Sequence, residues 1–264
     1  MTPNEPPAAL SIAGSDSGGG AGIQADLKAF ARCGVHGMTA ITAITAQNTR
    51  GVEMVELVSP QAVFAQILAI AQDMGADAIK IGMLGSAATI DAVAVALTYL
   101  GVQQAPVVID PVMVAESGAV LLDDETRKAL VDVLLPTCAV ATPNIPEARV
   151  LTGLGEGASQ EELARAVVAL GPSAVVVTGG HSEEMIDLFF DGERAVEIAG
   201  DRHPDGAAHG SGCTHSSALA AYLARGEEPL EAARLARQIA SAAVGAGLRG
   251  IGAGPGPVDV FGKG

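Results

Sequence analysis

The sequence predicts an α/β fold with a largely parallel central sheet and helices on both of its faces. Short apolar runs, many of them β-branched, alternate with longer amphipathic segments along the whole chain. Strands that alternate with helices form βαβ units, in which consecutive strands run parallel. Hydrophobic residues make up 49% of the chain and aromatic residues only 3%, so the core must consist mainly of Ala, Val, Ile and Leu.

The strands are predicted from the short apolar runs. They cover residues 8–13, 38–45, 52–58, 78–81, 106–109, 138–141, 174–177, 185–190 and 194–198. We expect the third of these to lie at an edge of the sheet. Asp191-Gly192-Glu193 separates the last two and predicts a hairpin.

The helices are predicted from amphipathic periodicity and from residues that favour helix ends. Gly34 is a C-terminal stop, Pro60 a helix start, and Asp123 or Asp124 an N-cap. Ser159 and Glu162 form a capping box. The predicted helices cover residues 23–33, 60–74, 87–100, 123–135, 146–151, 159–170, 212–224 and 229–248.

We expect a single domain over residues 1–264, with loose termini at 1–7 and 255–264, because both ends are rich in Pro or Gly. The formal net charge of −15 argues against nucleic acid or an anionic membrane as a partner. Three dispersed cysteines without a CxxC pair argue against a disulfide framework and favour a reducing compartment. The N-terminal segment lacks the features of a signal peptide, so we expect a cytoplasmic protein.

Two glycine-rich loops are candidate ligand sites. Residues 14–22 lie between a predicted strand and a predicted helix, but they match neither the P-loop nor the GxGxxG pattern, which makes a Rossmann-type oxidoreductase improbable. Residues 209–214 open a helix, so their N–H groups and the helix dipole form an anion site. Cys213 lies in that first turn, where a thiolate is stabilised and could act as a base. The alternatives are an ordinary turn and a buried apolar cysteine.

Several polar residues follow predicted strands and could complete a site at that edge of the sheet. Asn144, Glu147 and Asp110 suit Mg²⁺ and phosphate, although capping and turn roles are alternatives. Asp26 and Gln47 suit an aminated heterocycle, with surface solvation as the alternative. Met83 could lie flat against a ring, whereas Lys80 is expected to point outward.

In combination, these segments resemble the hydroxymethylpyrimidine/phosphomethylpyrimidine kinases over nearly the whole chain. The resemblance rests on residues 12–28, 42–51, 80–84, 110–113, 142–148, 179–181 and 209–214. It implies a ribokinase-like fold, a homodimer, and phosphorylation by ATP with Mg²⁺ of a pyrimidine hydroxymethyl group and then of the phosphate ester. Thr178, Ala207-Ala208, Ser211 and His215 depart from the family pattern, three of them near the expected phosphates.

The resemblance also implies roles for individual residues. Cys213 would be the general base, and Gly210, Ser211 and Gly212 would form the anion hole with it. The pyrimidine pocket would contain Gln47, Gly14, Asp26, Met83 and Val112. Asn144, Glu147, Thr178 and Gly180 would bind ATP, and Asp110 and Glu147 would bind the metal. The alternatives are a pyridoxal kinase of the same fold and a non-catalytic pyrimidine-binding regulator.

Overall fold

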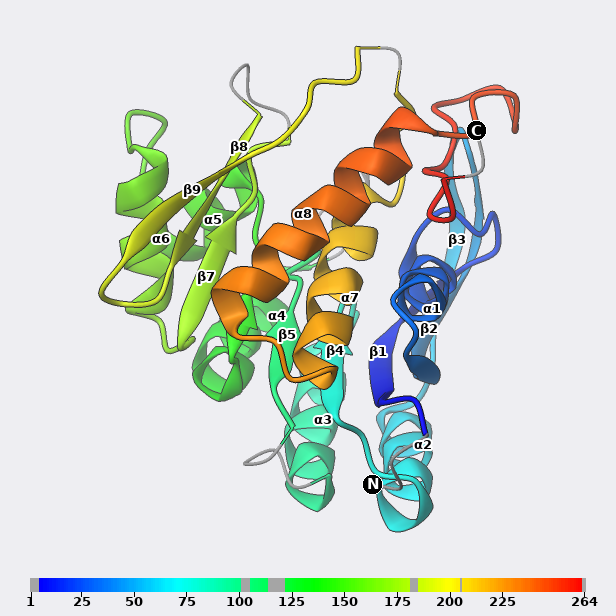
Figure 1. The fold of residues 1–264 in the computed structure, drawn as a ribbon. Helices are drawn as coiled ribbons and strands as arrows, with labels where there is room; N and C mark the ends of the chain where they lie inside the picture. The colour runs from blue at the N-terminus through cyan, green and yellow to red at the C-terminus, as the bar shows by residue number, and fades with distance from the viewer. Residues whose placement is uncertain (1–4, 101–104, 114–121, 181–184, 205, 263–264) are drawn as a thin grey trace.

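The computed structural model describes residues 5–100, 105–113, 122–180, 185–204 and 206–262. Its strands form one nine-stranded sheet in the order β3-β2-β1-β4-β5-β6-β7-β8-β9 (Figure 1). The pairs from β2 through β7 are parallel, and β3, β8 and β9 add antiparallel edges. The strands are β1 Ala8–Asp16, β2 His36–Asn48, β3 Gly51–Leu57, β4 Ala78–Ile81, β5 Val107–Ile109, β6 Val140–Ala141, β7 Ala174–Val177, β8 Ile186–Phe190 and β9 Ala195–Ala199. Every predicted strand, the edge strand and the hairpin are therefore confirmed.

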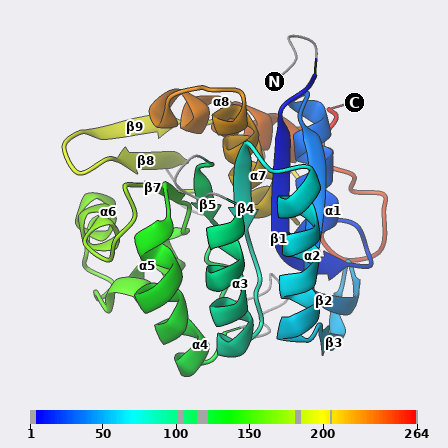
Figure 2. The same ribbon diagram turned by 90° about the horizontal axis from the view of Figure 1, so that it is seen from below.

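Helices cover both faces of the sheet, as predicted (Figure 2). The helices are α1 Gly22–Arg32, α2 Pro60–Asp73, α3 Ala87–Tyr99, α4 Asp124–Ala129, α5 Ile145–Thr152, α6 Gln160–Val168, α7 Ser211–Ala224 and α8 Pro229–Gly245. One buried cluster joins the sheet to α2, α3, α5 and α6, and a second joins it to α1, α7 and α8. Successive side chains of a strand point to opposite faces of the sheet, which explains why there are two clusters. In β1, Ala9 belongs to the second cluster, whereas Leu10 and Ile12 belong to the first.

The predicted helix over 123–135 changes its geometry near its end. After α4 the chain continues as a π-helical turn, Leu130–Leu134, and a 3-10 turn, Leu135–Thr137. Pro136 lacks the N–H that a regular α-helix requires, which accounts for the change. Leu134 and Leu135 are fully buried, so the irregular segment still packs against the core.

The expectation of a loose C-terminal segment is wrong for its described part. Val258 and Val260 are only 4% and 3% exposed and pack against Ala29 and Ala243. The N–H of Val258 donates to the carbonyl of His209 at 3.0 Å. These contacts bury apolar side chains and satisfy the backbone, which composition alone does not reveal. At the other end, residues 1–4 lie outside the described residues, and the Pro7 carbonyl accepts the His36 N–H at 2.8 Å.

None of the helices in the described ranges is both long and apolar enough to cross a membrane.

Candidate active site

A cavity of about 490 Å³ opens where the parallel strands of the sheet end. This is the edge at which α/β sheets bind ligands. Its lining contains nearly all of the predicted site: Gly14, Gln47, Met83, Asp110, Val112, Asn144, Glu147, Thr178, Gly180, Gly210, Ser211, Gly212 and Cys213. These residues therefore line one cavity, and their roles in a functional site stay predictions.

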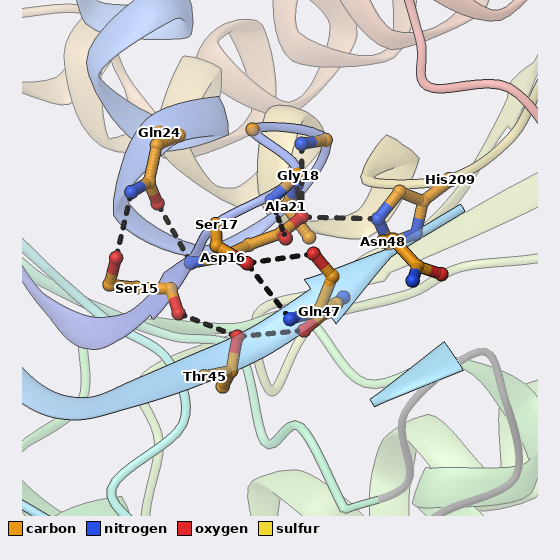
Figure 3. A network of polar contacts seen from close by, with 12 residues as sticks. Ser15, Asp16, Ser17, Gly18, Ala21, Gln24, Thr45, Gln47, Asn48 and His209 are labelled. Carbon is orange, nitrogen blue, oxygen red and sulfur yellow. Dashed lines mark hydrogen bonds and ion pairs between the residues drawn. The ribbon is translucent and has the colours of Figure 1, made fainter. Parts of the chain in front are cut away.

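Asp16 organises the first glycine-rich loop (Figure 3). Its carboxylate accepts the N–H groups of Gly18, Gly20 and Ala21 at 2.8–2.9 Å. The Nε2 of His209, in the second loop, lies 3.2 Å from the same carboxylate. Burial alone would raise the pKa of Asp16, but the hydrogen bonds from His209, Ala21 and Gly18 outweigh it and leave that pKa below its ordinary value. Asp16 is therefore an anionic anchor for the loop.

Gln47 is held beside this loop by its backbone. Ser17 Oγ donates to the Gln47 carbonyl at 2.7 Å and accepts the Gln47 N–H at 2.8 Å. The Gln47 side-chain oxygen lies 3.3 Å from Thr45 Oγ1. Because the backbone and one amide atom are already engaged, the remaining amide group can contact a ligand with a defined orientation.

Asp26 does not line the cavity, so the expectation that it contacts the substrate is wrong. It is fully buried on the inner face of α1. Its carboxylate accepts hydrogen bonds from Ser11 Oγ at 2.6 Å and Ser217 Oγ at 2.7 Å. Lys80 Nζ lies 3.1 Å from it as an ion pair. Asp26 therefore supports the floor of the site.

Lys80 is the functional residue that sequence reasoning misplaced. It was expected to point outward, but it is fully buried, lines the cavity and lies 3.9 Å from Asp110 as well as beside Asp26. Burial would lower the pKa of Lys80, yet Asp26, the ionised form of Cys213 and Asp110 raise it above its ordinary value. The position of Lys80 in a predicted central strand could have indicated its burial, because strands in the middle of a parallel sheet are buried on both faces. A lysine buried in this way needs a carboxylate partner.

Cys213 lies at the start of α7, as predicted, but its thiol is not acidified. Burial raises the pKa of Cys213 to about 12, and the carboxylates of Asp26 and Asp110 reinforce this shift. The ammonium group of Lys80 and the Gly22 N–H oppose it. The expectation of a lowered pKa is thus wrong, because desolvation outweighs the opposing effects of Lys80 and the Gly22 N–H.

The first turn of α7 has the geometry of an anion hole. Gly210 is its N-cap with φ +84, a left-handed conformation that glycine adopts readily. Gly210 has no side chain to cap this turn, and the Ser211 N–H donates to the Ala208 carbonyl at 2.9 Å. Residues 210–213 line the cavity, so the N–H groups of Gly212 and Cys213 can bind an anion there.

Asn144 and Glu147 form a reciprocal capping box at the start of α5. Asn144 Oδ1 accepts the Glu147 N–H at 2.8 Å, and the Glu147 carboxylate accepts the Asn144 N–H at 2.9 Å. The capping alternative is therefore confirmed, but both residues also line the cavity. Burial first, and Asp110 second, raise the pKa of Glu147 to about 8. Burial likewise raises the pKa of Asp110, although Lys80 opposes it.

The Asp110 and Glu147 carboxylates fit a divalent cation. Asp110 is buried and Glu147 is half-buried, and the pKa of each carboxyl is raised, so a cation beside them would favour their ionised form. Mg²⁺ is bound in proteins by one or two carboxylates together with phosphates. A cage of three or more His, Cys, Asp or Glu side chains is not found among the described residues. The donor set therefore suits a metal that arrives with a phosphate ligand.

The cavity lining also contains a buried polar cluster that the sequence did not indicate. Asp187 lies 3.4 Å from Arg237 Nη1 and 3.7 Å from His215 Nε2. Neither ring nitrogen of His215 has a hydrogen-bond partner among the described residues, although the residue is only 4% exposed. Burial, assisted by Arg237, lowers the pKa of His215, so its imidazole is neutral near pH 7. Met185, beside this cluster, has φ +52, a strained value for a residue with a side chain.

The chain resembles known kinases over nearly its full length. The family model for phosphomethylpyrimidine kinase matches residues 16–259. The hydroxymethylpyrimidine/phosphomethylpyrimidine kinase of Rhizobium meliloti is 49% identical over 259 residues, with 96% of each chain covered. Among solved structures, the pyridoxal kinase from Staphylococcus aureus in complex with AMP-PCP and pyridoxal is 33% identical, with a TM-score of 0.88 and 98% and 95% of the two chains covered. The phosphomethylpyrimidine kinase from Clostridium difficile is 39% identical, with a TM-score of 0.77 and coverages of 88% and 96%. The glycine-rich loops, the buried lysine and the cysteine at the helix start thus lie on a ribokinase-like fold, and the chain belongs to the phosphomethylpyrimidine kinase family.

Proposed function

We propose that this chain transfers the γ-phosphoryl group of ATP to the hydroxymethyl group of 4-amino-5-hydroxymethyl-2-methylpyrimidine, and then a second phosphoryl group to the monophosphate, in thiamine biosynthesis. The observation that carries the proposal is a single cavity that joins an anion hole at α7, Cys213 and a fixed Gln47 amide. Phosphoryl transfer needs mainly positioning and electrostatic stabilisation, which this arrangement can supply.

The chemistry follows from the side chains around the anion hole. The substrate oxygen attacks the γ-phosphorus, the bond from that phosphorus to the departing ADP oxygen breaks, and the hydroxyl proton passes to the Cys213 thiolate. Burial raises the pKa of the Cys213 thiol to about 12, whereas the ammonium group of Lys80 and the Gly22 N–H favour the thiolate form that accepts this proton. The N–H groups of Gly212 and Cys213, in the turn formed by residues 210–213, stabilise the charge on the transferring group. Gly14, Met83 and Val112 would enclose the ring, and the free amide group of Gln47 would orient it.

On the nucleotide side, Asn144, Thr178 and Gly180 line the cavity together with Glu147. Asp110 and Glu147 would hold Mg²⁺, which neutralises charge on the β- and γ-phosphates when it is bound. The Thr178 N–H donates to the Pro143 carbonyl at 2.9 Å, so that strand end is fixed beside α5. We therefore expect this side of the site to bind the nucleotide as its Mg²⁺ complex.

We also propose that the chain forms a single kinase domain, that two copies assemble as a homodimer, and that the protein acts in the cytoplasm. The outer ribbon of β2 and β3 exposes large apolar side chains: Ile44 is 51%, Met54 54%, Val55 39% and Leu57 45% exposed. A second copy would bury this surface, because exposed apolar edge strands otherwise aggregate. The free cysteines agree with a reducing compartment. Sedimentation of wild type and Met54→Asp tests the dimer, and a monomeric wild type would refute it.

The proposed activity is tested by incubating the protein with ATP, Mg²⁺ and the pyrimidine and resolving the products by mass spectrometry. Monophosphate and diphosphate together support both steps, whereas monophosphate alone limits the activity to the first. Turnover of pyridoxal instead would support the second candidate, a pyridoxal kinase, which the fold of the Staphylococcus aureus enzyme favours. Tight pyrimidine binding without turnover of either compound would favour the non-catalytic regulator.

A further inference from the structure

The two glycine-rich loops of the site are interlocked. Gly20 of the first loop and Gly210 of the second approach so closely that a Cβ on Gly210 would lie 1.7 Å from the Gly20 carbonyl oxygen. The His209 ring covers Gly20, where a Cβ would lie 2.2 Å from its Cδ2. Asp16 and His209 add a side-chain hydrogen bond of 3.2 Å between the same loops. Neither loop can move far unless the other moves too.

A continuous set of contacts leads from the pyrimidine side to this junction (Figure 3). Ser17 is bonded through its hydroxyl to both backbone groups of Gln47. The adjacent Asp16 holds the N–H groups of Gly18, Gly20 and Ala21 and reaches His209. Each contact is a hydrogen bond of 3.2 Å or less, so a displacement of Gln47 is transmitted to the loop as a whole.

On the nucleotide side, His209 precedes the N-cap of α7 directly. Its carbonyl accepts the Val258 N–H at 3.0 Å, so its backbone is fixed from behind by the C-terminal segment. The ring is 13% exposed and the Asp16 carboxylate only 3%. A hydrogen bond to a buried carboxylate is stronger than a neutral one and is lost at a higher cost. The orientation of residues 210–213 is therefore tied to the state of the first loop.

We propose that Asp16 and His209 are positioning residues that couple pyrimidine binding to nucleotide binding. The proposal deepens the proposed function and rests on it. A pyrimidine that orders Gln47 and the first loop also orders the anion hole, so the nucleotide then binds a site that is already organised. Because binding free energies are linked, the nucleotide must increase the affinity for the pyrimidine by the same factor.

Calorimetric titrations of the full-length protein measure this factor directly. The dissociation constant of the hydroxymethylpyrimidine is determined without nucleotide and with saturating AMP-PCP and Mg²⁺. For wild type we expect AMP-PCP to tighten pyrimidine binding about tenfold. His209→Leu, which lacks a donor for Asp16, should reduce this factor to below about twofold, whereas His209→Gln, which keeps a donor, should retain most of it.

Lys28 offers a matched control. Its ammonium group donates to the Gly19 carbonyl at 2.7 Å, so Lys28→Met removes a hydrogen bond from the same loop without touching the contact between the loops. This variant should keep the tenfold factor. Thermal unfolding of each variant shows whether the fold is intact, and the His209→Gln variant supplies the comparison if His209→Leu does not fold.

The outcomes separate the two proposals. A wild type that binds both ligands without mutual enhancement, or a full enhancement in His209→Leu, overturns the coupling and leaves the proposed function in place. An equal loss in Lys28→Met also overturns it, because general loosening of the loop would then suffice. A wild type that binds no pyrimidine at all overturns the proposed function and the coupling with it.

Discussion

The buried ion pair beneath the cavity allows a quantitative test of how the site is supported. Lys80→Met keeps the length of the side chain but removes the positive charge that lies 3.1 Å from Asp26. Both side chains are fully buried, so the Asp26 carboxylate would lose its counter-ion in a place that water does not reach. Breaking a buried pair in this way typically costs about 3–5 kcal/mol of unfolding free energy.

The remaining partners of Asp26 place the expected loss at the lower end of that range. The hydroxyl groups of Ser11 and Ser217 still donate to the carboxylate at 2.6 and 2.7 Å. We therefore expect a loss of about 3 kcal/mol for Lys80→Met, or a decrease in Tm of about 6–12 °C for a chain of this size. Urea unfolding followed by circular dichroism measures the free energy, and calorimetry measures Tm.

A double variant separates the charge from the packing. Asp26→Asn combined with Lys80→Met leaves no buried charge of the pair, so it should be more stable than Lys80→Met alone by at least about 1 kcal/mol. If Lys80→Met lost less than about 1 kcal/mol, the ion pair would not be the support that its burial indicates. If the double variant were as unstable as the single variant, loss of packing rather than uncompensated charge would be the cause.

Three further predictions concern the lining of the cavity. Cys213→Ala should lower kcat by about 10²–10⁴-fold and leave the pyrimidine dissociation constant nearly unchanged, because it removes only the base; unchanged turnover in steady-state assays would reject that role. Gly210→Ala places a methyl group 1.7 Å from the Gly20 carbonyl and strains φ +84, so kcat/KM should fall at least about 10²-fold, and near-wild-type kinetics would show that the anion hole tolerates displacement. His215→Leu removes two buried ring nitrogens that have no hydrogen-bond partner in the described parts of the chain, so it should raise the unfolding free energy by about 1 kcal/mol in urea titrations. Burial lowers the pKa of His215 below its ordinary value of 6.5, so on acidification the unfolded chain binds a proton before the folded chain does. The unfolding free energy of wild type should therefore fall as the pH drops below 6.5, and that of His215→Leu should not show this fall. Identical pH profiles for the two proteins would refute the assignment.

Much of the site could be predicted because its signals are local. Gly210 and Cys213 lie at a helix start that the sequence marks by itself, and the geometry of that turn depends on a few consecutive residues. Asn144 and Glu147 are likewise three residues apart and form their capping box within one turn. Strand ends that meet at one edge of a parallel sheet then place these turns around a common cavity.

The sequence by itself determined the order of strands and helices, the two glycine-rich loops and the edge of the sheet at which they meet. Only the tertiary structure decided the environments of Lys80, Asp26, His209 and Cys213. Lys80 finds its partner 54 positions away, and Asp16 contacts His209 across 193 positions. Such contacts depend on how distant segments pack, and the pKa of a thiol depends on the desolvation that this packing produces. Local patterns therefore locate a site, whereas charge states and couplings within it arise from burial and long-range contacts.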